Sequence, residues 1–155
     1  QFYPVAVGFK YKMCNIQAAI GCAQVERVAT LITRKREILS HYRTQIAALS
    51  GVDVNPEPTG TVNGAWMPTV VFQPVTGVTR EMLMEGFTAE NIDARVFFHP
   101  LSGLPMFDDV SENHHAWDIP GRAINLPSYH DMTEADLDRV GDVLERIHSV
   151  GKCRG

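Results

Sequence analysis

The sequence has no apolar run of the roughly 18 residues that a membrane span needs, and no signal-peptide pattern opens it. It also has no excess of positive charge, because 14 lysines and arginines stand against 18 aspartates and glutamates, for a net charge of −4. Nucleic-acid binding usually needs a basic surface, so neither a nucleic acid nor a membrane is an expected partner. What remains is 155 residues, 45% hydrophobic and 21% charged, which fit one folded domain.

Paired cysteines are also missing. Cys14, Cys22 and Cys153 are odd in number and form no CxxC motif. This pattern indicates free thiols in a reducing cytoplasm. The sequence starts with Gln1 rather than Met, and we therefore expect a piece of a longer protein.

Proline is absent from a long stretch of helical periodicity. Apolar residues recur at spacings of three and four from Asn15, a plausible N-cap, to about Leu49, and Gly21 is the only glycine between them. A straight helix of about 35 residues would be roughly 50 Å long. A compact domain of this size is only about 40 Å across. We therefore expect either a bend, near Gly21, or an N-terminal part that packs against something outside the sequence.

Shorter elements follow the turn-rich segment 55–64. The patterns predict a strand at 66–72, a helix at 80–91 capped by Thr79, a strand at 93–98, a loop at 99–111, a helical turn within 116–124, a strand at 124–127 and a helix from 133 to about 149 with a capping box.

This order of elements predicts an α/β (α+β) fold. A long N-terminal helix would precede a small antiparallel or mixed sheet with helices on one face. The expected parts are an arm at 1–14, a connecting helix at 15–50 and a small C-terminal domain at 51–155.

Several catalytic motifs are missing. Neither a glycine-rich phosphate loop nor a dinucleotide-binding motif is present. No G-x-S-x-G frame surrounds Ser102 or Ser128, so hydrolase chemistry is not indicated. His114 and His115 lie near carboxylates, but adjacent side chains diverge on a helix or a strand, and the HxxxH and CxxC spacings are absent. We expect no metal site.

Two groups of residues are candidates for binding an anion. Lys10 and Lys12 precede a helix N-terminus, where the helix dipole favours negative charge, although their spacing alone fits two solvated lysines in a turn better. Arg95 begins an apolar strand, and His99 and Ser102 follow it in a loop. These three could hold a phosphate or carboxylate, or Arg95 could form a surface ion pair.

In order and spacing, the sequence resembles the C-terminal part of a DegT/StrS-type sugar aminotransferase, a fold-type-I family that uses pyridoxal phosphate (PLP). The family pattern Gly-aromatic-Asn-Tyr-Arg/Lys-Met enters a Gln-Ala-Ala-Ile-Gly helix. The matching segments are Gly8–Met13, Gln17–Arg27, Ala94–Arg95, Phe97–Phe98, Pro100–Leu101 and Leu126–Pro127. The resemblance covers about Val7 to His148, and the segment 97–102 is most similar to the perosamine-forming subfamily.

The resemblance implies a homodimeric enzyme that transfers an amino group, usually from glutamate, to a nucleotide-linked keto-sugar in amino-sugar and polysaccharide biosynthesis. In this family a lysine forms a Schiff base with PLP, and an aspartate holds the pyridinium nitrogen. Both lie upstream of the segment that this sequence matches. We therefore expect no catalytic residue in the 155 residues, and no amino transfer by them alone.

The family's Asn-Tyr-Arg segment reaches across the dimer to the partner's cofactor phosphate. This implies cofactor-binding roles for Lys10, which stands in the asparagine position, and for Tyr11. On the substrate side the resemblance implies Lys12, Arg95, Phe98, His99 and Ser102. Ser102 stands where the family often has histidine.

Two alternatives stay open. A PLP-dependent sugar dehydratase of the same family has a histidine in place of the Schiff-base lysine, at a position upstream of this sequence. A non-catalytic α+β interaction domain would instead use the long helix and its small side chains, Ala18–Ala23, for self-association.

Overall fold

The computed structural model describes residues 3–153 of the chain. The helices are α1 (Asn15–Glu26), α2 (Val28–Ile46), α3 (Arg80–Ala89), α4 (His114–Asp118) and α5 (Glu134–Lys152). The strands are β1 (Val52–Val54), β2 (Thr69–Phe72), β3 (Arg95–Val96) and β4 (Ala123–Asn125), and the short 3-10 helices are η1 (Pro74–Thr76), η2 (Leu101–Gly103) and η3 (Ile119–Gly121).

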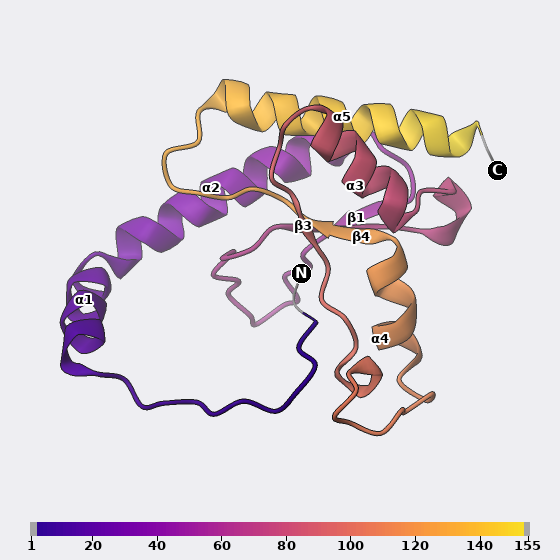
Figure 1. The fold of residues 1–155 in the computed structure, drawn as a ribbon. Helices are drawn as coiled ribbons and strands as arrows, with labels where there is room; N and C mark the ends of the chain where they lie inside the picture. The colour runs from indigo at the N-terminus through magenta and orange to yellow at the C-terminus, as the bar shows by residue number, and fades with distance from the viewer. Residues whose placement is uncertain (1–2, 154–155) are drawn as a thin grey trace.

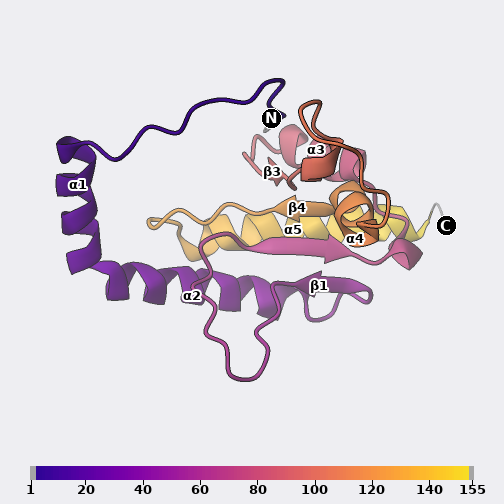
Figure 2. The ribbon, with the colours of Figure 1, turned by 90° about the horizontal axis from the view of Figure 1, so that it is seen from below.

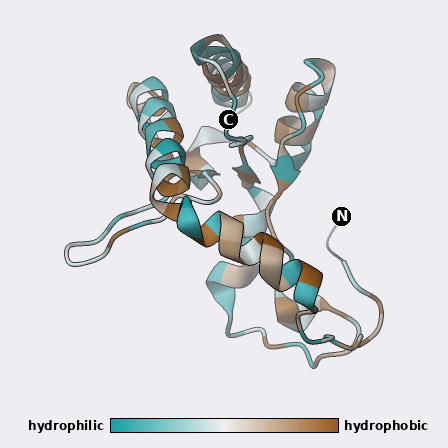
Figure 3. Cartoon of the chain, turned by 90° about the vertical axis from the view of Figure 1, so that its left-hand side faces the viewer, coloured by the Kyte–Doolittle hydropathy of each residue, from teal (hydrophilic) through white to brown (hydrophobic). Residues whose placement is uncertain are grey.

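The four strands form one antiparallel sheet in the order β1-β2-β4-β3. Helices α2, α3 and α5 lie together on one face of it (Figures 1 and 3). The expected α/β class, with a small sheet and helices on one face, is confirmed, and the sheet is antiparallel rather than mixed.

The core lies between this sheet face and the three helices. Alternate residues of β2, Val70 and Phe72, are buried and face the helices, as the two-residue period of a strand requires. Tyr42 of α2 is fully buried, and its hydroxyl donates to the Pro127 carbonyl at 2.8 Å. Phe87 and Leu144 supply further buried side chains from α3 and α5.

Two sequence-based helix caps are confirmed, whereas the N-cap of α1 is Cys14 and not Asn15, which is the first residue of the helix. The Thr79 hydroxyl accepts from the Met82 N–H at the start of α3. At α5, Thr133 and Asp136 form a reciprocal capping box. Hydrogen bonds from the Thr133 N–H and hydroxyl lower the pKa of Asp136. This stabilisation is therefore present above the ordinary pKa of the carboxyl and is lost as the pH falls through the lower value of the folded state.

The long N-terminal helix is divided into two. The bend lies at Arg27, where φ is −112° and ψ is 12°, and not near Gly21 as the sequence suggested. Figure 2 shows α1 turned steeply away from α2. On either side of the bend little is buried, because α1 buries no residue and α2 buries residues only from Ile38 onward. Both α1 and the first half of α2 therefore lie outside the buried core.

The strand β1 was not expected from the sequence. It is three residues long, and its identity depends on pairing with β2, Val52 opposite Phe72 and Val54 opposite Val70. Among residues 3–153, no helix is both long and apolar enough to span a bilayer.

Candidate functional site

The predicted cofactor residues lie on an exposed arm. Residues 3–14 form no helix or strand and run outside the packed domain to α1 (Figures 1 and 2). Lys10, Tyr11 and Lys12 are exposed and line a hollow of about 560 Å³ together with Met13 and Gln17. Within residues 3–153 neither lysine has an ion-pair partner. The hollow therefore holds two ammonium groups and no carboxylate.

The hollow opens beside the first turn of α1. The Cys14 N–H donates to the Gln17 side chain at 3.0 Å, and no acidic residue lies in the first turn. The positive end of the helix dipole thus adds to the two lysine charges. This combination can bind a phosphate or another small anion.

The predicted substrate loop holds His99 and Ser102. The His99 ring lies 3.5 Å from the Arg80 guanidinium, measured from Nε2 to Nη2. Burial, and next the positive charge of Arg80, lower the pKa of His99. The buried Ser102 hydroxyl has no hydrogen-bond partner among the described residues. Phe98 is partly exposed, and its ring lies against Phe97 at 6.1 Å between centroids.

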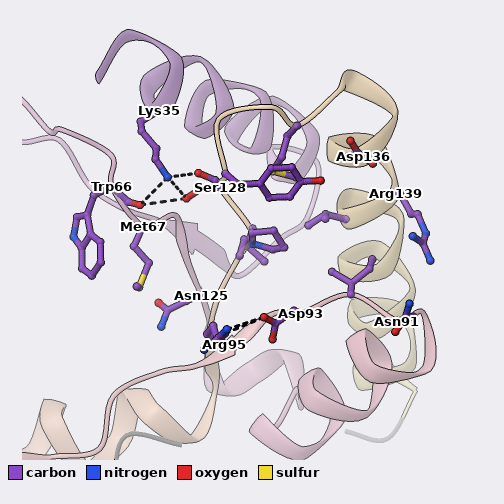
Figure 4. Close-up of a pocket in the computed structure, with 16 residues that line it drawn as sticks. Lys35, Trp66, Met67, Asn91, Asp93, Arg95, Asn125, Ser128, Asp136 and Arg139 are labelled. Atoms are coloured by element: carbon purple, nitrogen blue, oxygen red, sulfur yellow. Dashed lines mark hydrogen bonds and ion pairs between the residues drawn. The ribbon is translucent and has the colours of Figure 1, made fainter. Parts of the chain in front are cut away.

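Arg95 lines a separate cavity of about 510 Å³ (Figure 4). Its Nε and Nη2 donate to the same Asp93 carboxylate oxygen, at 3.2 and 2.8 Å. The ion pair considered from the sequence is therefore present, while Arg95 still borders the cavity. Trp66 and Tyr129 are both exposed and contribute aromatic surface to the lining.

Lys35 is a cavity residue that the sequence did not reveal. Its Nζ donates to the Ser128 hydroxyl at 2.9 Å, to the Ser128 carbonyl, and to the Trp66 carbonyl at 3.4 Å. Burial lowers its pKa. These acceptors lie 31 and 93 residues away, so no local pattern marks the lysine.

The structure brings together some predicted site residues and separates others. Lys10, Tyr11 and Lys12 share one hollow. His99 and Ser102 share one loop, but neither lines the cavity that Arg95 borders. Because Lys12 lies in the arm hollow, the predicted substrate side is thus divided among three regions within one chain. Among residues 3–153 no group of three histidine, cysteine or acidic residues lies close enough to hold a metal ion.

The chain has clear relatives. Residues 1–145 match the DegT/DnrJ/EryC1/StrS aminotransferase family. GDP-perosamine synthase of Vibrio cholerae is 33% identical over 151 residues, which are 95% of this chain and 40% of that enzyme. The chain spans about 40% of the length of the curated relatives it matches.

Solved structures show the same fold. DesI, crystallised in the presence of its TDP-sugar product, is 26% identical with a TM-score of 0.76, over 88% of this chain and 36% of DesI. The GDP-4-keto-6-deoxy-D-mannose-3-dehydratase of E. coli, with bound hydrated PLP, has a TM-score of 0.73 at 18% identity, over 88% of this chain and 36% of that one. At that identity the likeness shows the fold alone. Because the family match covers nearly the whole sequence, the resemblance noted from its motifs is confirmed, and the chain belongs to the DegT/DnrJ/EryC1/StrS aminotransferase family.

Proposed function

We propose that this chain is the C-terminal part of a PLP-dependent enzyme that transfers an amino group from glutamate to a nucleotide-linked keto-sugar. Beside family membership, one observation carries the proposal: the arm presents two lysines without ion-pair partners within residues 3–153, outside the packed domain. A free anion-binding arm has no use within the small domain. It suits a site that another subunit completes.

In the proposed enzyme the arm serves a partner subunit. Lys10 and Tyr11 meet the phosphate of PLP, with Lys10 acting as a point charge and Tyr11 as a hydroxyl donor. The residues fit this group, because the hollow is cationic and lies at a helix N-terminus. PLP, when bound, supplies the electron sink through which an amino group passes between donor and acceptor.

Helix α1 supports the same assembly. It buries no residue in the chain, and Ile16 and Ile20 are exposed. In Figure 3, α1 stands apart from the helices that pack on the sheet, and part of its ribbon has the hydrophobic colour. Burying apolar area stabilises by roughly 25 cal/mol per Å², so an uncovered helix of this kind favours a neighbour. The small residues Ala18–Ala23 let that neighbour approach closely.

The substrate side is assigned to Lys12, Arg95, Phe98, His99 and Ser102. Their contribution is to bind and orient the nucleotide-linked sugar. The buried Ser102 hydroxyl supports this role, because an unpaired buried polar group costs about 1–3 kcal/mol and gains from a ligand partner. Arg95 supplies a guanidinium at the rim of its own cavity.

We assign no lysine of this chain to the Schiff base with PLP. Lys35 is the best-enclosed candidate, but its three N–H groups are directed at three acceptors, which hold it as a structural ammonium. Lys152 bonds the Ser50 hydroxyl at 2.9 Å on the far side of the domain. Amino transfer therefore needs a lysine from outside these 155 residues.

Product analysis tests the proposed reaction. The enzyme that contains this chain, supplied with PLP, ¹⁵N-glutamate and a GDP-linked 4-keto-sugar, should place ¹⁵N on the sugar and release 2-oxoglutarate. A dehydratase would instead yield a deoxy keto-sugar without nitrogen. The similarity in fold to a dehydratase makes that the second candidate. Nitrogen-free sugar as the sole product would overturn the aminotransferase proposal.

Light scattering tests the proposed homodimer. We expect the 155-residue chain to self-associate, because the arm and α1 leave large apolar side chains exposed, with Phe9 92% and Ile16 74% accessible. Replacing Ile16 and Ile20 with glutamine should reduce this association. The matched control, Val75→Gln, alters an equally exposed residue on η1, at the other end of the domain. A stable monomer of the unsubstituted chain would count against the homodimer. It would also count against an interaction domain that self-associates, and would leave only an interaction domain with a different partner.

A further inference from the structure

Arg80 lies against the one histidine that the substrate side contains. It is the first residue of α3, and its Nη2 is 3.5 Å from Nε2 of His99. A guanidinium has five N–H donors and no acceptor, and it stays protonated in proteins. The His99 nitrogen that faces it must therefore offer a lone pair. A proton on Nε2 would set two donors against each other.

The His99 ring is also held from a second direction. The Tyr3 ring packs edge-on against it, with 5.3 Å between centroids and 81° between planes. The Tyr3 hydroxyl donates to the Gly103 carbonyl at 3.1 Å, which ties the start of the arm to the loop. The Tyr3 contact thus helps to hold the plane of the His99 ring beside Arg80.

We propose that Arg80 is a positioning residue that holds His99 as a neutral imidazole with its proton on Nδ1, so that His99 donates a hydrogen bond to a substrate oxygen. This inference rests on the proposed substrate role of the 97–102 loop. The nearby Arg80 charge favours an oxygen that is itself negative, and a nucleoside diphosphate provides such oxygens. The lowered pKa of His99, caused first by burial and then by the Arg80 charge, agrees with a neutral ring.

A second histidine, His148, provides an internal reference with the opposite expected tautomer. His148 is buried, and its Nε2 lies 2.9 Å from the Ser50 carbonyl oxygen. A carbonyl only accepts, so His148 must carry its proton on Nε2. The two histidines are therefore expected to be opposite tautomers in the same spectrum, and the His148 signal also reports that the domain is folded.

Long-range ¹H–¹⁵N spectra of histidine-labelled protein test the proposal, with His99→Gln to assign the signal. In the unsubstituted protein, His99 should show its proton on Nδ1. Arg80→Lys keeps a charged donor and should preserve this tautomer, whereas Arg80→Met should move the proton to Nε2. Arg146→Met is the matched control, since Arg146 lies on α5 and pairs with Glu90 at the end of α3.

Two results would overturn the inference: a proton on Nε2 of His99 in the unsubstituted protein, or an Arg80→Met spectrum that is unchanged while His148 reports a folded domain. If Arg80→Met does not fold, the tautomer of the unsubstituted protein still decides. Adding GDP to the assembled enzyme should then shift the Nδ1–H signal of His99. If the tautomers are as expected but GDP causes no shift, Arg80 still positions His99. The substrate contact of His99 and the proposed role of the 97–102 loop would then be wrong.

Discussion

Replacing Lys10 with methionine should weaken PLP binding by about 10- to 100-fold in the assembled enzyme. A hydrogen bond to a charged group is worth about 1.5–3 kcal/mol, and each 1.4 kcal/mol is a tenfold change in affinity. Lys10 has no ion-pair partner within residues 3–153, so the substitution leaves no buried charge unpaired and should not unfold the chain. Absorbance titration of the apoenzyme with PLP measures the effect.

Lys152→Met is the matched control for this experiment. This substitution removes the same charge from the opposite end of the domain. There the Lys152 ammonium bonds only Ser50 among the described residues. Its PLP affinity should equal that of the unsubstituted enzyme. Equal affinities for Lys10→Met and Lys152→Met would mean that the arm does not meet the cofactor phosphate, even if the family's reaction is confirmed.

Gly77→Ala should lower the free energy of unfolding by about 3 kcal/mol. Gly77 ends η1 with φ of +65°, a backbone conformation that costs an L-residue roughly 1–2 kcal/mol. An added Cβ would also lie 2.9 Å from the Gly151 carbonyl oxygen, which is backbone and cannot rotate away. The contact joins the end of α5 to the turn between β2 and α3.

Urea unfolding followed by circular dichroism measures this loss. Gly121→Ala serves as the control, because its added Cβ meets nothing within 4 Å and its φ is not positive. We expect the control to change stability by less than about 0.5 kcal/mol. Equal midpoints for the two variants would show that the turn relaxes around the new methyl group without cost.

Local chemistry explains which parts of the fold were predictable. Thr79 and Thr133 predict helix starts because an N-cap hydroxyl accepts a hydrogen bond from the backbone N–H three residues later. The strand β1 was missed because it depends on pairing with a distant strand, and the bend lies at Arg27 and not near Gly21. The three residues of β1 are identified as a strand only by their pairing with β2.

The site shows the same division. Lys10 and Lys12 are exposed, and the sequence pattern left a solvated turn open beside an anion site, whereas the family resemblance implied an arm that meets a phosphate. The separation of Arg95 from His99 depends on the path of the loop after β3, which no spacing rule gives. Lys35 and Arg80 were missed for the same reason, because each is identified only by groups that folding brings to it.

A single non-helical residue separates α1 from α2, so a small rotation there moves the arm at the other end of α1. Arg27 separates helices that end at Glu26 and begin at Val28, so the direction of α1 is set by very few dihedral angles. Twelve helical residues are about 18 Å long, and turning them by about 10° about that joint displaces the far end, next to Lys12, by about 3 Å. That distance is the difference between a direct phosphate contact and a broken one. In the enzyme proposed above, a turn of about 10° at Arg27 would therefore make or break the contact between the arm and the partner's cofactor phosphate.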